Sequence, residues 1–184
     1  MLDRETILQA LSAMSDRLAE KGVRGEVCLF GGAAMVLAFQ TRQSTKDIDA
    51  IFAPTAALRE AADEIAERFD LPLGWFNDGV KGWVSAEHAT TQAELPQFPN
   101  LSVSMPVPEY LLAMKCMAAR AEAESRDFED VKFLLARLNF TETQSVFDLI
   151  EHYYPARLIP PRTRYFVEAA FDELNRSKPS PDRD

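Results

Sequence analysis

The chain has 184 residues, with 20 Lys and Arg against 29 Asp and Glu, and therefore a formal net charge of −9. This length suits one domain, and the hydrophobic share of 47% with a charged share of 27% is typical of a folded globular protein. The acidic balance excludes a protein that coats DNA or RNA through its whole surface. It leaves open a local basic groove, or an anionic substrate held through metal ions.

The compartment follows from the N-terminus and the cysteines. The first residues, Met1-Leu2-Asp3-Arg4, lack the layout of a signal peptide, and no apolar run approaches the roughly 18 residues that span a bilayer. Cys28 and Cys116 lie in apolar segments and offer no disulfide framework. We therefore expect a reducing, cytoplasmic setting and no membrane partner.

The first half of the chain alternates helical and strand patterns. In chain order, the apolar periodicity predicts a helix over 3–21, a strand over 27–30, a helix over 33–39, a strand over 47–52 and a helix over 54–69. Pro and Gly residues then interrupt the pattern from 71 to 100, where we expect loops and short strands.

The second half is mainly helical. The pattern predicts a strand over 101–105 and helices over 108–123, 125–137, from Thr141 with a capping box to Gln144, and 164–174. The sequence therefore predicts an α+β fold, with a small mixed sheet flanked by helices and a helical C-terminal part. We expect a core over 1–140, C-terminal helices packed on it over 141–175, and a disordered tail over 176–184.

Asp47-Ile48-Asp49 is the most informative motif. Residues i and i+2 of a strand point to the same face, so both carboxylates project together. Two like charges side by side are unfavourable unless a cation lies between them, and Mg²⁺ prefers carboxylate oxygens while leaving room for phosphates. The alternative is a strand end at which both aspartates are hydrated by solvent.

Gly31-Gly32 stands where the first strand passes into a short helix. Glycines permit a tight turn there, and the N–H groups at a helix start favour phosphate. A plain turn is the alternative. The position of the pair one helix before Asp47 and Asp49 favours a phosphate-binding role.

Two later helices supply a lysine and two carboxylates. Lys115 lies among apolar side chains on its helix, so its ammonium group either extends to the solvent-exposed edge or binds an anion. Asp127 projects within the apolar stripe of the next helix and Asp130 lies on its flank. A carboxylate in such a stripe needs a cation or hydrogen-bond donors, although Asp127 is also placed to complement the helix dipole.

Together these residues resemble the nucleotidyltransferase superfamily with the DNA polymerase β-type fold, and within it the abortive-infection and toxin-type bacterial enzymes. The resemblance covers about residues 25 to 138. It rests on Gly31-Gly32, then Arg42, Thr45 and Asp47-Ile48-Asp49, then Leu112-Ala113-Met114-Lys115 and Arg126-Asp127-Phe128-Glu129-Asp130.

The resemblance implies the transfer of a nucleoside monophosphate from an NTP to an RNA (tRNA) or protein acceptor. Asp47 and Asp49 would bind Mg²⁺, for which Mn²⁺ can substitute. The nucleotide would be bound by Gly31, Gly32, Arg42, Thr45 and Lys115. Asp127 or Asp130 would orient Lys115 or act as an acid or base.

The chain departs from the superfamily on one strand. Many members carry a third metal-binding carboxylate there, whereas the predicted strand 101–105 has Ser102 and Ser104 and no acid. Asp127 or Asp130 would then supply the missing group, with Asp78 as a weaker candidate. The alternative function is a catalytically silent nucleotide-binding or protein-interaction module on the same fold.

The resemblance also suggests a biological role. The protein would be the toxin of a toxin–antitoxin pair, with a cognate antitoxin as partner. An RNA acceptor would require a basic groove, for which the sequence offers Arg120, Arg126, Arg157, Arg162 and Arg164, residues that would otherwise form a solvated surface.

Overall fold

The computed structural model describes residues 1–85, 87–92, 95–118 and 126–177. They form two compact units. The first comprises residues 1–84 and 89–107, and the second comprises 85–88 together with the chain from Pro108 onward. The fold is α+β, as the sequence predicts. None of the helices in these ranges is long and apolar enough to cross a lipid bilayer.

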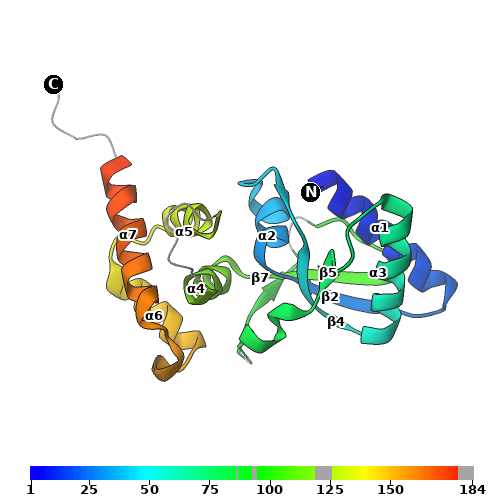
Figure 1. Cartoon of the computed structure of the whole chain (residues 1–184). Helices are drawn as coiled ribbons and strands as arrows, with labels where there is room; N and C mark the ends of the chain where they lie inside the picture. The colour runs from blue at the N-terminus through cyan, green and yellow to red at the C-terminus, as the bar shows by residue number, and fades with distance from the viewer. Residues whose placement is uncertain (86, 93–94, 119–125, 178–184) are drawn as a thin grey trace. The chain divides into compact units, whose positions relative to one another are not determined.

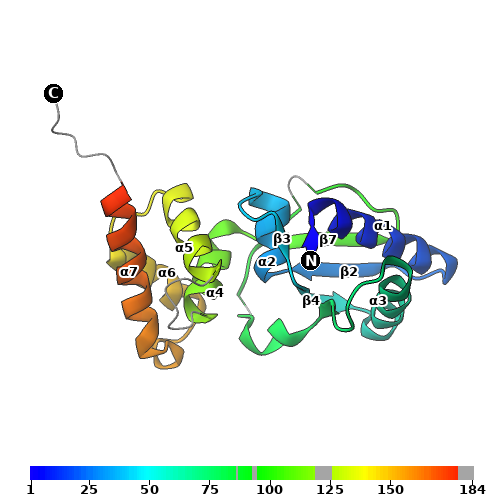
Figure 2. The ribbon, with the colours of Figure 1, turned by 45° about the horizontal axis from the view of Figure 1, so that its top comes forward.

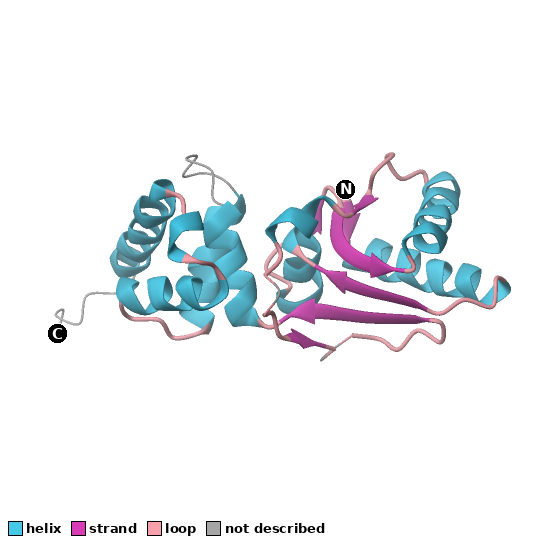
Figure 3. Cartoon of the chain, turned by 90° about the horizontal axis from the view of Figure 1, so that it is seen from below, coloured by secondary structure: helices cyan, strands magenta, loops and turns pink. Residues whose placement is uncertain are grey.

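A five-stranded mixed sheet forms the centre of the first unit (Figures 1 and 3). Its spatial order is β5 (Phe76–Asn77), β4 (Ile48–Ala53), β2 (Gly25–Leu29), β7 (Leu101–Pro106) and β6 (Thr90–Thr91). β2 runs antiparallel to β4 and parallel to β7, β5 runs parallel to β4, and β6 runs antiparallel to β7. A separate pair joins β1 (Leu2–Asp3) to β3 (Ser44–Thr45).

Helices α1 (Arg4–Glu20) and α3 (Thr55–Phe69) pack together on one face of this sheet (Figure 1). The strands alternate accordingly, since a strand presents successive side chains to opposite faces. The residues facing the helices are buried, namely Val27, Leu29, Ile48, Ala50, Phe52, Leu101, Val103 and Met105. The residues between them are half-buried or exposed, and they form what we term the open face: Glu26, Cys28, Asp49, Ile51, Ala53, Ser102 and Ser104.

One short helix departs from its predicted form. It begins at Gly31 rather than at Ala33, and after one α-helical segment, α2 (Gly31–Ala34), it continues as a π-helical turn over Met35–Phe39. Gln40 ends it in the left-handed region, with φ of 52°. The glycines that the sequence assigns to the turn therefore form the first residues of the helix itself.

The second unit is a group of helices (Figure 2). It contains α4 (Pro108–Ala118), α5 (Arg126–Arg137), α6 (Thr143–Tyr153) and α7 (Pro161–Ser177), with α4 packing on α5 and α6, and α7 packing on α5. The units divide at residue 108, whereas the sequence prediction set the boundary at 140, because α4 and α5 share their apolar faces with the later helices. The predicted packing of helices 141–175 on the core stays a prediction.

Three predicted helix ends need correction or lie outside the described residues. The capping box at Thr141 is wrong, because α6 begins at Thr143 and Gln144 bonds instead to Asp148. α7 begins at Pro161, three residues before the predicted start, because proline is favoured in the first turn. Arg120, the predicted cap Ser125, residues 119–123 of the predicted helix and most of the predicted tail lie outside the described residues.

Candidate functional site

Gly31 packs directly against the carboxylate of Asp49. Gly31 has φ of +57°, a conformation that side-chain-bearing residues rarely adopt. A Cβ added to it would lie 2.9 Å from Asp49 Oδ2. The backbone on either side of this contact is also joined, because Phe30 N, next to Gly31, donates a hydrogen bond to Asp49 O of β4 at 2.8 Å. The absence of a side chain at Gly31 therefore creates the space in which this carboxylate lies.

Gly32 makes a similar close approach to two other predicted nucleotide-binding residues. A Cβ on Gly32 would lie 2.4 Å from Thr45 Oγ1 and 3.2 Å from Arg42 Nη1. Thr45 belongs to the short strand β3 and is buried. Five predicted site residues from separate parts of the chain, Gly31, Gly32, Arg42, Thr45 and Asp49, are thus brought together in the first unit. We call this group the glycine–aspartate cluster.

Asp47 and Asp49 differ in their surroundings. Asp49 is half-buried on the open face of β4, whereas Asp47 is exposed and lies just before the strand. β4 begins at Ile48, one residue after the predicted strand start. Within the described ranges, no group of three or more His, Cys, Asp or Glu side chains is arranged to hold a metal ion. Mg²⁺ binds through one or two protein carboxylates and takes its remaining oxygens from phosphates and water, so Asp47 and Asp49 are the residues that would hold such an ion.

Asn77 is a neighbour of Asp49 that the sequence interpretation missed. β5 pairs with β4 in parallel with Asn77 opposite Asp49, so both residues lie on the open face. Asn77 Oδ1 accepts a hydrogen bond from Gly79 N at 3.0 Å, which orients the amide. The two-residue strand β5 lies in a region of weak periodicity, and in the sequence only the position of Asn77 between Phe76 and two later glycines marks it.

The open-face positions of β7 carry hydroxyl groups where many superfamily members carry a third acid. Ser104 lies beside Cys28 of β2, and Cys28 in turn lies beside Ile51 of β4. The Ser104 hydroxyl is directed to the backbone, since Oγ donates to Val27 O at 3.4 Å. The described part of β7 therefore offers no carboxylate to a metal ion.

Asp78, the weaker candidate for that third acid, is engaged elsewhere. It pairs with Lys81 at 2.7 Å and with Arg59 of α3 at 2.9 Å. The hydrogen bond from Lys81, supported by Arg59, holds the pKa of Asp78 below its usual value. These partners give Asp78 a structural role between α3 and the turn at Gly79–Trp83.

The three predicted site residues of the second unit form an ion triad in which Lys115 and Asp130 are buried. Lys115 Nζ lies 2.7 Å from Asp127 Oδ1 and 2.6 Å from Asp130 Oδ2. Lys115 is 6% exposed and Asp130 only 2%. One ammonium between two carboxylates leaves the triad with a formal charge of −1, and each charge needs the others because unpaired buried charges are costly.

The structure reverses the predicted order of the two aspartates. The sequence places Asp127 within the apolar stripe, yet its side chain is 35% exposed, whereas Asp130 is buried. Asp130 meets Lys115 of α4 and is buried together with Phe128 and Val131 of α5. Asp130 is therefore the inner partner of Lys115.

Three features define the class of protein. The mixed sheet, the glycine pair that leads into a short helix and the following Asp-x-Asp strand are those of a nucleotidyltransferase. The model of the DUF6036 family, described as a nucleotidyltransferase of unknown function, matches residues 5–157, and the chain belongs to this family. No curated protein and no solved structure was found to match the chain. The predicted membership of the nucleotidyltransferase superfamily is thereby confirmed.

Proposed function

We propose that the protein is a metal-dependent enzyme that transfers a nucleoside monophosphate from an NTP to a hydroxyl group of an acceptor. The acceptor oxygen attacks the α-phosphorus and forms a new P–O bond. The bond between the α-phosphorus and the oxygen that bridges to the β-phosphate breaks, and pyrophosphate leaves with that electron pair. The hydroxyl proton passes to solvent.

The packing of Gly31 against Asp49 carries this proposal. A carboxylate held against Gly31, the first residue of α2, brings a metal-binding group beside the start of a helix, where free backbone N–H groups favour phosphate. Gly32 repeats the arrangement against Thr45 and Arg42, and Arg42 adds a cation suited to phosphate.

Asp47 and Asp49 would hold the metal ion. Bound Mg²⁺, or Mn²⁺ in its place, neutralises triphosphate charge and favours ionisation of the acceptor hydroxyl. Asp49 is fixed by its strand and by Gly31, whereas Asp47 precedes the strand and is exposed. We infer that Asp49 provides the pre-positioned ligand and that Asp47 completes the site when nucleotide binds.

Lys115 would neutralise phosphate charge, with Asp127 and Asp130 holding its ammonium group in position. Asp130 is buried and would stay paired. Asp127 is the more exposed partner, and it would exchange its hold on Lys115 for solvent when an anion arrives. This role of the triad is supported by the two ion pairs that hold the buried ammonium group of Lys115 in place.

The acceptor would be a tRNA or a protein, and the biological role would be that of a toxin neutralised by a cognate antitoxin. An RNA acceptor needs a phosphate-binding surface, to which Arg126, Arg157, Arg162 and Arg164 of the second unit would contribute. These assignments derive from the resemblance to the toxin-type enzymes.

Calorimetry with each of the four NTPs, with and without Mg²⁺, tests the proposal. We expect Mg²⁺-dependent binding of at least one NTP by the wild type and its loss in Asp49→Ala. Asp63→Ala, which removes an exposed carboxylate from α3 in the same unit, is the control and is expected to bind normally. The proposal fails if the wild type binds no NTP in the presence of Mg²⁺.

The hydroxyl groups on the open face of β7 favour a second candidate, a catalytically silent nucleotide-binding or protein-interaction module. Without a third carboxylate, NTP binding need not lead to transfer. Incubation with α-labelled NTPs, total tRNA and cell protein separates the two functions. Label in RNA or protein supports the enzyme, whereas Mg²⁺-dependent NTP binding without label supports the silent module.

A further inference from the structure

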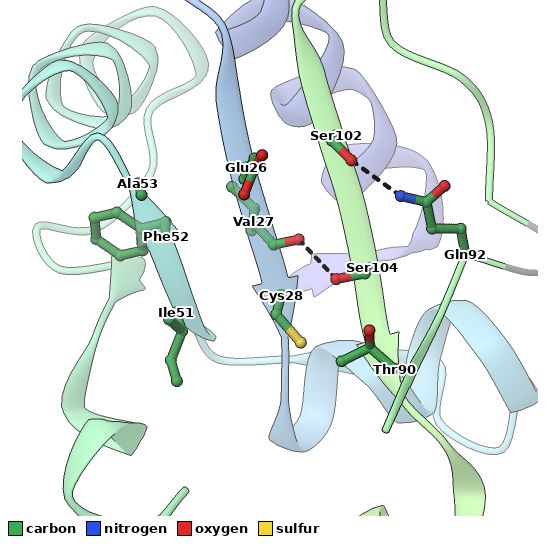
Figure 4. A pocket seen from close by; sticks show the side chains of 10 residues that line it. All are labelled: Glu26, Val27, Cys28, Ile51, Phe52, Ala53, Thr90, Gln92, Ser102 and Ser104. Atoms are coloured by element: carbon green, nitrogen blue, oxygen red, sulfur yellow. Dashed lines mark hydrogen bonds between the residues drawn. The ribbon is translucent and has the colours of Figure 1, made fainter. Parts of the chain in front are cut away.

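The open face of the sheet carries a groove that the proposed nucleotide chemistry does not use. A hollow of about 540 Å³ lies over β2, β4 and β7, with Thr90 and Gln92 at its side (Figure 4). Its floor is polar. Gln92 Nε2 donates to Ser102 Oγ at 3.0 Å, and Ser104 Oγ donates to the backbone of Val27. The floor thus presents hydroxyl and amide groups that suit a hydrogen-bonding ligand.

The groove is elongated. A second hollow of about 230 Å³ continues it along β7 toward Asn100, and the two share Glu26, Gln92 and Ser102. Ser102 and Ser104 stand two residues apart on one face of β7, a spacing of about 7 Å. The same spacing separates alternate side chains of an extended peptide.

The groove also leads to the proposed catalytic carboxylate. Ile51 lines the larger hollow and lies on the same face of β4 as Asp49, two residues away. Glu26 pairs with Ala53, which lies four residues beyond Asp49. Along an extended strand this separation is about 13 Å. A chain lying in the groove would therefore pass Asp49 and Glu26 at positions four residues apart.

The charge of the groove suits a basic ligand. Among the described residues that line the larger hollow, Glu26 is the one with a charged side chain, and it is exposed. Arg24 lines only the smaller hollow. A nucleic acid backbone needs several Lys or Arg contacts, which this lining lacks. A single carboxylate in a groove of mixed polarity instead attracts one cationic side chain.

We propose that this groove binds an extended polypeptide segment of a protein acceptor. The segment places a Ser, Thr or Tyr hydroxyl at Asp49 and a Lys or Arg side chain beside Glu26, about four residues away. This inference rests on the proposed function, and it selects a protein rather than RNA as the acceptor. Glu26 acts here as a residue that determines specificity and takes no part in the transfer itself.

Cys28 provides a probe of groove occupancy, and Cys116 serves as its buried reference. Cys28 lines the larger hollow, whereas Cys116 is fully buried in the second unit. The test uses the full chain and a short synthetic peptide with one serine and an arginine four residues from it. We expect the peptide to slow maleimide labelling of Cys28, read by intact mass. We also expect it to accept label from an α-labelled NTP.

Charge variants make the test specific. Glu26→Arg should raise the peptide concentration needed for half-protection by about tenfold or more, because like charges then meet in the groove. Glu67→Arg, the same exchange at an exposed position of α3, should change it less than about twofold. Thermal unfolding of both variants shows whether they are folded. The peptide with glutamate in place of arginine should protect poorly.

Two results overturn the inference. One is protection of Cys28 by single-stranded RNA and not by the basic peptide. The other is equal loss of peptide protection in Glu26→Arg and Glu67→Arg, which would indicate attraction to the acidic protein as a whole. In both cases the proposed function stands if the wild type still binds an NTP with Mg²⁺. Failure of that binding measurement is a separate result.

Discussion

The nearest side-chain atom to a Cβ placed on Gly31 is the Oδ2 atom of Asp49, at 2.9 Å. Real Cβ atoms essentially never approach another heavy atom so closely. The glycine and the carboxylate of the Asp-x-Asp strand therefore pack as one unit, although they lie 18 positions apart in the chain. A side chain at residue 31 cannot be added without moving Asp49.

Gly31→Ala should consequently weaken metal-dependent nucleotide binding. The positive φ costs about 1–2 kcal/mol for a residue with a Cβ, and the new methyl group displaces the Asp49 carboxylate. We expect a moderate loss of the free energy of unfolding in urea and at least a tenfold loss of Mg²⁺-dependent NTP affinity, equivalent to about 1.4 kcal/mol.

Gly22→Ala is the matched control for this variant. Gly22 also has a positive φ, +65°, but a Cβ there meets nothing within 4 Å. It should therefore lose a similar free energy of unfolding and keep its NTP affinity. Equal NTP affinity in the two variants would show that the contact between Gly31 and Asp49 has no role in binding.

Gly32 and Thr45 should be energetically coupled. A Cβ on Gly32 lies 2.4 Å from Thr45 Oγ1, and Thr45 is buried, so Gly32→Ala overpacks the site at a cost of about 1–3 kcal/mol. Thr45→Ala removes that oxygen. In urea unfolding, the double variant should lose less stability than the sum of the two single variants, by about 1 kcal/mol. Strict additivity would contradict the contact.

The strands and helices that face a core were predictable because their apolar periodicity is regular. Helix α1, strand β4 and helix α3 begin and end within two residues of their predicted bounds. The paired aspartates and the glycine pair were also recognisable, since their residue types, order and spacing are unusual for plain turns. What brings Gly31 to Asp49 and Gly32 to Thr45, however, is tertiary packing.

The features that sequence reasoning missed depend on contacts between distant segments. Asn77 lies beside Asp49 only because a two-residue strand pairs in parallel with β4, and such a strand is too short to leave a pattern. Asp130 is more buried than Asp127 in the packed unit, where it lies 2.6 Å from Lys115 of α4. A helical wheel of α5 alone cannot include this neighbour.

The ion triad should respond unequally to the loss of its two carboxylates. Asp130→Ala leaves the nearly buried Lys115 with one partly exposed partner and should cost about 3–5 kcal/mol, as for a broken buried ion pair. Asp127 is more exposed, and Asp127→Ala should cost about 1 kcal/mol. Urea unfolding followed by circular dichroism measures both.

A charge-free replacement of the inner pair is the control for the triad. Lys115→Met with Asp130→Leu removes the two buried charges together and should recover most of the stability that Lys115→Met alone loses. If Asp127→Ala proves as destabilising as Asp130→Ala, the burial of Asp130 does not set the energetics of the triad.

The thiol groups of Cys28 and Cys116 should differ sharply in reactivity as the pH rises. Burial raises the pKa of the Cys28 thiol above its usual value, with a hydrogen bond to Ser104 opposing part of that shift, and burial raises the pKa of Cys116 to about 12. The thiolate is the reactive form, so raising the pKa lowers its fraction at a given pH. Maleimide labelling of Cys28 at pH 8 should therefore be slower than labelling of a free model thiol. It should accelerate about tenfold per pH unit until the pH passes the pKa of Cys28.

Cys116 should stay unlabelled throughout this range in the folded chain and react only in urea. Intact-mass spectrometry with a Cys28→Ser variant assigns each label, and rapid labelling of that variant without urea would show that Cys116 is accessible.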